Sequence, residues 1–476
     1  MPSMRAFDTP LPIDAVLGDL AAALRVGPNA VLVAPPGAGK TTRVPLALLD
    51  EPWTNGGKLI VLEPRRLAAR GAANRMAQTL GERVGETVGL RVRLGSKIGP
   101  KTRIEVVTEG VFARMILDDP ALQGVAAVLF DEFHERSLDA DFGLALALDA
   151  QSGLREDLRI LVMSATLDGA RVAKLLGKAL HGEARVIESQ GRAYPVETRY
   201  LGREPLKRIE DQVADAVLMA LNEQAGSQLV FLPGQGEIRR VEERLRERIR
   251  DASVEIAPLY GALDQSEQDR AVLPTPAGRR KVVLATAIAE TSLTIEGVRV
   301  VIDSGLARVP VYEPDLGVTR LETRRASRAA CDQRRGRAGR TEPGICYRLW
   351  EEAGNGALEA FARPEILSAD LAPLLLDCAA WGVSDPTTLA FLDPPPAPAL
   401  KEARSLLASI GALDADGRIT PEGKTLQTLP LPPRLARMVV VATRFGQAGA
   451  AAMLAAILVE RGLGGDAPDL AERLER

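Results

Sequence analysis

Short apolar runs alternate with helix-length segments up to about residue 350 of the chain. Each run is rich in Val, Ile and Leu and is bounded by Gly, Pro or Asp, which is typical of strands buried in parallel α/β sheets. The runs form two groups, so we expect two sheets joined by a hinge at Glu188–Tyr194. The predicted strands are Ala30–Val33, Leu59–Leu62, Ile104–Val107, Ala127–Phe130 and Ile160–Met163, then Gln228–Leu232, Lys281–Ala285 and Val298–Ile302.

The pattern changes to helices after about residue 352. A proline-rich turn, Asp393–Pro398, interrupts them, and Leu400–Leu413 then has helical spacing. The segment GRITPEGK that follows indicates a short strand and turn, and helices followed by a small β-hairpin favour a winged-helix module. From Pro421 onwards the sequence again predicts helices.

Composition limits the class of protein. The 476 residues are 46% apolar and 26% charged, which is ordinary for a globular chain of about three domains. Three scattered cysteines, Cys331, Cys346 and Cys378, provide neither a disulfide framework nor a CxxC metal pair. The most apolar segment, Ala448–Val459, is about 12 residues long, well short of the roughly 20 that span a bilayer. No signal peptide is evident, so we expect a cytoplasmic enzyme without a membrane partner.

The charge balance alone does not indicate a nucleic-acid partner. Lys and Arg total 60 against 63 Asp and Glu, a net charge of −3, and nucleic-acid-binding domains are usually basic. Only ten of these cations are lysines, and arginine is the side chain that binds phosphate in a bidentate manner. A general compositional bias explains most of this excess, so the position of the arginines matters more than their number.

The segment Ala34–Thr42, APPGAGKTT, follows a predicted strand and precedes a predicted helix. It fits the phosphate-loop pattern, with Ala34 in place of the first glycine. Glycines at 37 and 39 allow backbone N–H groups to surround phosphates at the start of a helix. Lys40 is then expected to reach the β- and γ-phosphates, and the Thr41 hydroxyl to bind Mg²⁺.

A predicted strand also runs into an acidic pair, in the sequence VLFDEFHER (Val128–Arg136). We expect Asp131 to hold Mg²⁺ through water and Glu132 to orient and polarise the attacking water. His134 follows Asp131 by three residues and is expected between the two sheets. His181, the other histidine of the chain, lies in a polar turn and is interpreted as structural.

Seven arginines occur between Arg324 and Arg340. In the sequence QRRGRAGR, Gln333 can position water, and Arg337 and Arg340 are spaced to point together at a γ-phosphate. An arginine supplied across a domain interface raises the hydrolysis rate by about 10³–10⁵-fold. For the other arginines near the start of the cluster, ordinary surface ion pairs are as good an interpretation.

These motifs, with SAT at Ser164–Thr166, together resemble superfamily 2 helicases of the DEAH/RHA class. The resemblance extends to LEPRRLAAR, VTEG, FLPGQGEI and ATAIAETSLTIEGVRVVIDSG and covers roughly residues 10–476. Phe133 departs from the alanine of DEAH, and the form DEFHER looks like the bacterial HrpB subgroup.

The resemblance implies an α/β fold with two tandem RecA-like parallel-sheet domains. A winged-helix domain and the start of a helical ratchet-like domain would follow. The corresponding ranges are 1–188, 189–352, 353–420 and 421–476.

The resemblance also implies roles for individual residues. Ser164 and Thr166 would couple hydrolysis to movement between the domains. Arg75 would stack on the adenine, with Val272 in place of an opposing aromatic residue, and Asp303 would lie near the nucleotide. The residues implied in ATP binding are Gly37, Ala38, Gly39, Lys40, Thr41, Thr42, Arg75 and Asp303, and those implied in nucleic-acid binding are Arg65, Arg66, Thr108, Ser292 and Thr294.

The sequence therefore predicts a monomeric, ATP- and Mg²⁺-dependent RNA helicase that acts on single-stranded RNA or on RNA with a single-stranded overhang. Two alternatives stay open. A single-stranded DNA translocase would use the same catalytic residues. A nucleotide-dependent switch that remodels RNA with little unwinding would turn over ATP slowly.

Overall fold

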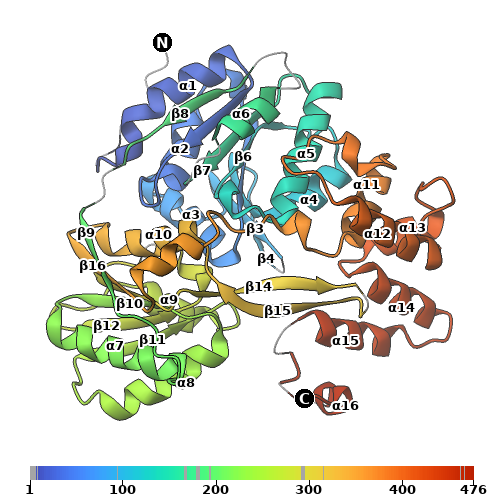
Figure 1. Cartoon of the computed structure of the whole chain (residues 1–476). Helices are drawn as coiled ribbons and strands as arrows, with labels where there is room; N and C mark the ends of the chain where they lie inside the picture. The colour runs from blue at the N-terminus through green and yellow to red at the C-terminus, as the bar shows by residue number, and fades with distance from the viewer. Residues whose placement is uncertain are drawn as a thin grey trace. The chain divides into compact units, whose positions relative to one another are not determined.

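The computed structural model contains two large sheets and one two-stranded sheet. It describes residues 7, 9–93, 95–165, 169–177, 183–191, 194–290, 295–314, 316–460, 463–465 and 467–475. The chain divides into two compact units, residues 1–309 with 321–364 and residues 310–320 with 365–476. Both large sheets belong to the first unit, in which the colours of Figure 1 run from blue to orange.

The first sheet has the strand order β4-β3-β5-β2-β6-β7-β1-β8, and only β3 and β4 pair antiparallel. Every strand predicted for this sheet is present. Its strands are β1 (Asn29–Val33), β2 (Lys58–Glu63), β3 (Val88–Val92), β4 (Gly95–Lys97), β5 (Ile104–Thr108), β6 (Val125–Phe130), β7 (Arg159–Ser164) and β8 (Arg185–Glu188). The α-helices before and between these strands are α1 (Leu17–Val26), α2 (Lys40–Leu48), α3 (Arg66–Thr79), α4 (Glu109–Asp118), α5 (Leu138–Gly153) and α6 (Gly169–Gly177).

Burial explains why the central strands β1 and β6 were predicted and why the edge strands β4 and β8 were not. All residues of β1 and β6 are buried, as expected for central strands covered on both faces. The edge strands β4 and β8 are mostly exposed and carry polar residues, a usual property of sheet edges. They consequently lack the apolar run on which the prediction depended.

The second sheet is entirely parallel, with the order β11-β12-β10-β13-β16-β9. The chain enters it between β8 and β9, within and just after the predicted hinge. Its strands are β9 (Val196–Tyr200), β10 (Ser227–Phe231), β11 (Val254–Leu259), β12 (Arg280–Ala285), β13 (Val298–Asp303) and β16 (Gly344–Arg348). Its helices are α7 (Ile209–Glu223), α8 (Gln235–Arg248), α9 (Gln265–Val272) and α10 (Arg328–Gly336), with short 3₁₀ helices η5 (Ala287–Ala289) and η6 (Arg337–Gly339).

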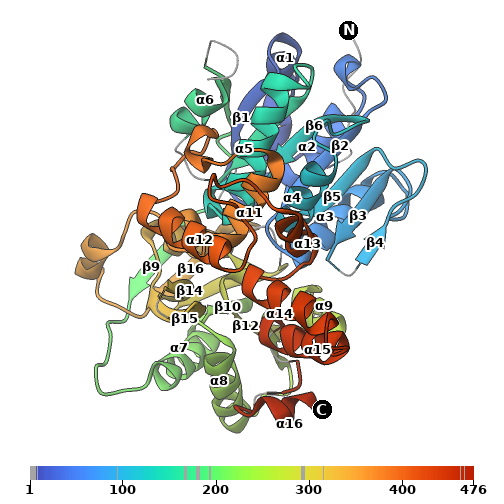
Figure 2. The same ribbon diagram turned by 90° about the vertical axis from the view of Figure 1, so that its right-hand side faces the viewer.

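Strands β14 (Leu306–Glu313) and β15 (Val318–Arg325) form the two-stranded sheet, whose tip belongs to the second compact unit. The rest of that unit is helical, and Figure 2 shows α14 packed beside α15. Its α-helices are α11 (Ala372–Trp381), α12 (Ala397–Ser409), α13 (Pro421–Thr428), α14 (Pro433–Thr443), α15 (Ala448–Val459) and α16 (Leu470–Leu474).

The hairpin predicted after α12 is reduced to a single bridge between Leu413 and Ile419. The chain reverses tightly, and Asp414 N–H donates to Arg418 O at 2.9 Å. Thr420 already caps α13, since its hydroxyl accepts a hydrogen bond from Gly423 N–H. The start of α13 therefore leaves no room for longer strands.

Within the described ranges, no helix is both long and apolar enough to cross a membrane. The three cysteines are free thiols in buried positions.

Candidate active site

Three neighbouring strands of the first sheet, β6, β7 and β1, bring the predicted motifs together. The phosphate loop follows β1, the acidic pair follows β6, and Ser164 ends β7 beside Val33. Because the strands are parallel, their carboxyl ends lie at one edge of the sheet, where α/β proteins bind ligands.

The phosphate loop needs its two glycines. Gly37 and Gly39 have φ values of 85° and 96°, in the left-handed region that favours glycine. A Cβ on Gly37 would lie 3.4 Å from Nε of Arg340, and one on Gly39 would lie 2.6 Å from Cδ1 of Leu11. A side chain at either position would therefore strain the backbone, and one at Gly39 would also collide with Leu11.

The N-terminal segment packs against the phosphate loop and supports it. The sequence did not predict this support. Ile13 N–H donates to Ala38 O at 3.1 Å, and Leu11 packs on Gly39. Phe7 stacks against the guanidinium of Arg43 at 4.0 Å, on the helix that follows the loop. No motif or periodicity indicates these contacts, because they depend on how the segment folds back on the loop.

Lys40 lies between the two predicted carboxylates. Its Nζ is 2.8 Å from Oε1 of Glu132 and 3.8 Å from Oδ1 of Asp131. The Thr41 hydroxyl donates to Oδ2 of Asp131. Lys40, Asp131 and Glu132 are each at most 3% exposed, so these residues form one buried cluster.

Burial and mutual attraction set the ionisation of this cluster. Burial lowers the pKa of Lys40, but Glu132 and Asp131 outweigh it, so the pKa is raised. Burial raises the pKa of Asp131 to about 6, against the opposing effect of Lys40. For Glu132, burial is outweighed by Lys40 and His134, and its pKa is lowered to about 2. Glu132 is thus the carboxylate that stays ionised.

Glu132 is also held in an unusual backbone conformation, with φ at 49°. Such left-handed non-glycine residues are strained and cluster at functional sites. Nδ1 of His134 lies 3.5 Å from Oε2 of Glu132 and accepts a hydrogen bond from Ala165 N–H at 3.2 Å. Burial lowers the pKa of His134 to about 4, although Glu132 and the neighbouring Gln333 oppose this effect. The imidazole is therefore neutral at physiological pH, with its proton on Nε2.

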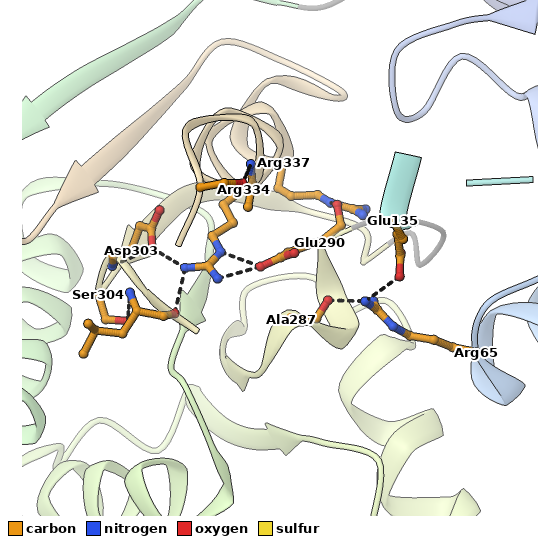
Figure 3. A network of polar contacts seen from close by, with 12 residues as sticks. Arg65, Glu135, Ala287, Glu290, Asp303, Ser304, Arg334 and Arg337 are labelled. Atoms are coloured by element: carbon orange, nitrogen blue, oxygen red, sulfur yellow. Dashed lines mark hydrogen bonds and ion pairs between the residues drawn. The ribbon is translucent and has the colours of Figure 1, made fainter. Parts of the chain in front are cut away.

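In the second sheet, Arg334 anchors a buried polar network, which Figure 3 shows. Its guanidinium pairs with Asp303 at 2.7 Å and with Glu290 at 2.6 Å, and it donates to Leu306 O at 3.1 Å. The backbone carbonyl of Glu290 accepts a hydrogen bond from Nε of Arg337 at 2.9 Å. We did not predict a role for Arg334 or Glu290, because the spacing of residues along the sequence does not indicate that the two side chains pair.

Arg337 and Arg340 reach towards the first sheet. Arg337 begins the 3₁₀ helix η6 and Arg340 directly follows its last residue, and residues three apart in this conformation eclipse one another. Burial lowers the pKa of both, to about 10 for Arg340; Arg340 further lowers that of Arg337, and Glu132 opposes the shift in both cases. The Arg340 side chain lies against Gly37. Both predicted arginines are therefore close to the phosphate-loop site.

The predicted nucleic-acid contacts are placed less uniformly. Arg65 donates to Ala287 O at 2.7 Å and pairs with Glu135 at 3.0 Å. Arg66 is exposed on α3, as is Arg75, which was predicted to stack on the adenine and not to contact RNA, and Thr108 precedes α4. Three predicted residues, Thr166, Ser292 and Thr294, lie outside the described residues.

The remaining nucleotide-site predictions differ in exposure. Asp303 is fully buried, with its carboxylate paired to Arg334. Thr42 and Val272 are half-buried.

The part of the chain that the structure describes contains no cluster of three or more His, Cys, Asp or Glu side chains able to hold a metal. The Thr41 hydroxyl and the Asp131 carboxylate nevertheless contact one another. An oxygen pair of this kind fits Mg²⁺, which usually takes one or two protein ligands and completes its shell with phosphates and water.

Comparisons with known proteins agree with this geometry. The model of the DEAD/DEAH box helicase family matches residues 19–175, and that of the helicase conserved C-terminal domain matches residues 210–342. The winged-helix part of the helicase associated domain (HA2) matches residues 403–431.

The chain is 51% identical over 450 residues to "ATP-dependent RNA helicase HrpB" of Escherichia coli, covering 94% of this chain and 55% of that protein. It is 37% identical over 430 residues to "Pre-mRNA-splicing factor ATP-dependent RNA helicase prp22" of Schizosaccharomyces pombe, covering 87% of this chain and 36% of that protein. The chain thus spans little more than half the length of the HrpB relative and about a third of the prp22 relative.

Among solved structures, a crystal structure of Escherichia coli DEAH/RHA helicase HrpB matches with a TM-score of 0.89 and 48% identity, over 98% of this chain and 60% of that one. A second, of the E. coli DExH-box NTPase HrpB, has a TM-score of 0.84 at 48% identity, over 100% of this chain and 58% of that one. The two large sheets are accordingly RecA-like domains followed by a winged-helix domain. The chain belongs to the DEAD/DEAH box helicases and, within them, is close to HrpB of the DEAH/RHA class.

Proposed function

We propose that the chain is an ATP-dependent RNA helicase that couples ATP hydrolysis to movement along RNA or to its unwinding. The proposal rests on one observation: charged side chains from both sheets lie close together at the phosphate loop. Lys40 and its carboxylates come from the first sheet, and two arginines reach the same loop from the second. The names of the two relatives, both ATP-dependent RNA helicases, support RNA as the substrate.

In this proposal the phosphate loop binds the triphosphate of ATP. Backbone N–H groups of residues 37–42 surround the phosphates, and Lys40 turns from Glu132 towards the β- and γ-phosphates. Thr41 and Asp131 would hold Mg²⁺, which neutralises charge on the phosphates when bound. Arg75 and Asp303 are proposed to lie near the nucleotide.

Hydrolysis then depends on groups from both domains. Glu132, which stays ionised, accepts the proton of the attacking water. Gln333 positions that water, and neutral His134 lies at the interface between the two domains. Arg337 and Arg340 stabilise the negative charge that spreads over the transferred phosphoryl group.

Movement would follow from opening and closing of the two RecA-like domains. Ser164 and Thr166 are proposed to transmit the change at the nucleotide. The residues proposed to contact the RNA backbone are Arg65, Arg66, Thr108, Ser292 and Thr294. We propose domain limits at 1–188, 189–352, 353–420 and 421–476, and a monomeric protein of the bacterial cytoplasm.

The test is steady-state ATP hydrolysis with and without single-stranded RNA. Lys40→Ala is expected to abolish RNA-stimulated hydrolysis, because it removes the cation that contacts the phosphates. Glu132→Gln should bind ATP but hydrolyse it at least about 100-fold more slowly. If Lys40→Ala retained wild-type hydrolysis, the assignment of the phosphate loop would be wrong.

The same assay separates the alternatives. Single-stranded DNA of equal length would stimulate a DNA translocase better than RNA does. A nucleotide-dependent switch would turn over below roughly 10⁻² s⁻¹ at saturating RNA, which is slow for phosphoryl-transfer enzymes. The proposal expects RNA to be the better activator and turnover to be above that value.

A further inference from the structure

The start of helix α3 contacts the second RecA-like sheet at three points. Nη1 of Arg65 donates to Ala287 O at 2.7 Å. Leu67, which is 8% exposed, packs in an apolar cluster formed otherwise by residues of the second sheet and its helices. Arg70 pairs with Asp269 at 3.1 Å. This end of α3 is therefore where the first sheet meets the second.

The contact of Arg65 differs from the other two because its partner, Ala287, lies in the turn that also holds Arg337. Ala287 begins η5, and Glu290 directly follows its last residue. The carbonyl of Glu290 holds Arg337, and its carboxylate holds Arg334. A single turn of 3₁₀ helix thus links Arg65 to the arginine proposed to face the γ-phosphate, as Figure 3 shows.

The other side of the Arg65 guanidinium faces the first sheet's catalytic loop. Its Nη2 lies 3.0 Å from Oε2 of Glu135. Glu135 follows His134 directly and lies three residues after Glu132. A planar guanidinium with two donor edges can hold two acceptors in fixed positions, which an ammonium group does less well.

We propose that Arg65 is a positioning residue that sets Arg337 in register with Glu132. Its guanidinium bridges the loop that carries the water-activating carboxylate and the turn that holds the arginine. This inference rests on the proposed function, because ATP turnover is its measure. This role does not require RNA, and it is additional to the nucleic-acid contact that the sequence predicted for Arg65.

The two roles of Arg65 predict different kinetics. If Arg65 positions Arg337, Arg65→Ala lowers kcat about 10- to 100-fold even without RNA, since small misplacements cost rate in this range. The KM for ATP should then change less than about twofold. If Arg65 only contacts RNA, turnover without RNA is unchanged. The RNA concentration for half-maximal stimulation instead rises, and the slope of log affinity against log salt falls by about 0.7.

Two further variants sharpen the test. Arg65→Lys keeps a cation for an RNA phosphate but loses the planar fork, so we expect its RNA-free turnover to stay low. Arg70→Ala is the matched control, because it removes another arginine of α3 that pairs with the second sheet but not with η5. Its RNA-free turnover should stay within about twofold of wild type.

The experiment is a set of RNA-free and RNA-saturated ATPase measurements on these variants, with thermal unfolding midpoints as a check of folding. Low kcat without RNA for both Arg65 variants, with Arg70→Ala near wild type, supports the inference. Wild-type RNA-free turnover in either Arg65 variant, or an equal loss in Arg70→Ala, would overturn it and leave the proposed function intact. A wild-type chain that hydrolyses no ATP would contradict the proposed function and, with it, this inference.

Discussion

The two halves of the proposed ATP site are both buried and both rich in charge, yet their cations are in opposite electrostatic situations. Lys40 of the first sheet has two carboxylates beside it, and its pKa is raised despite burial. Burial lowers the pKa of Arg337 and Arg340 of the second sheet. In the first half the cation already has carboxylate partners, whereas in the second half burial disfavours the charged arginines and an incoming anion favours them.

This difference gives the halves different tasks. A lysine already paired with Glu132 must exchange that carboxylate for phosphate, which favours reversible ATP binding. Burial lowers the pKa of both arginines, so negative charge that spreads over the phosphoryl group stabilises their charged form. We therefore expect variants of the second half to affect kcat, and the loop of the first half to affect the KM for ATP.

Among variants that keep Lys40, the largest effect is expected for Arg337→Ala. It removes a cation from the transition state but leaves the phosphate loop intact, so kcat should fall about 10³-fold or more. The KM for ATP should change little. Steady-state kinetics at saturating RNA measure both constants, and a rise in KM with an unchanged kcat would contradict the division of tasks.

Glu132→Gln should come next, with kcat lowered about 10²–10³-fold. The amide cannot accept the proton of water, and it also removes a negative charge near the phosphates. The KM for ATP should therefore stay level or fall, as equilibrium binding of a labelled nucleotide would check independently. Weaker nucleotide binding in this variant would argue against a carboxylate that acts on water.

Gly37→Ala should have a smaller effect, on binding. The residue has φ at 85°, and the new Cβ would lie 3.4 Å from Nε of Arg340. Backbone strain of about 1–3 kcal/mol predicts a KM for ATP raised about tenfold. Gly56→Ala is a suitable control, because Gly56 also has positive φ, at 75°, but has open space around its Cβ.

The smallest effect is on stability and depends on pH. Burial raises the pKa of Asp131 to about 6. The folded state consequently binds a proton that the unfolded state releases between about pH 4 and 6, and stability falls as pH rises through that range. Asp131→Asn mimics the protonated form and should stabilise the protein by on the order of 1 kcal/mol at pH 8, with no gain near pH 4. Unfolding midpoints at both pH values test this sign, and a gain at pH 4 alone would contradict it.

Much of the fold and the core of the site could be predicted from sequence, for a physical reason. Buried parallel strands are continuous apolar runs, so β1 and β6 were visible, and the motifs begin where those strands end. Parallel pairing then requires Lys40 and Asp131 to share one edge of the sheet.

What the sequence did not predict depends on contacts between distant segments. Arg334 is one of several arginines in QRRGRAGR, and nothing local distinguishes it as the one buried against Asp303 and Glu290. The packing of Leu11 on Gly39 likewise depends on the N-terminal segment folding back. The predicted hairpin is a single bridge, because the cap at Thr420 starts α13 directly after it.

The central claim is that the two RecA-like domains supply one catalytic unit. Its most direct test is the turnover of the Glu132→Gln/Arg337→Ala double variant beside the two single variants. Groups that stabilise one transition state are strongly non-additive, so the double variant should be no more than about tenfold slower than the slower single variant. A loss equal to the product of the two single losses would show that the two halves act independently, and would contradict the account.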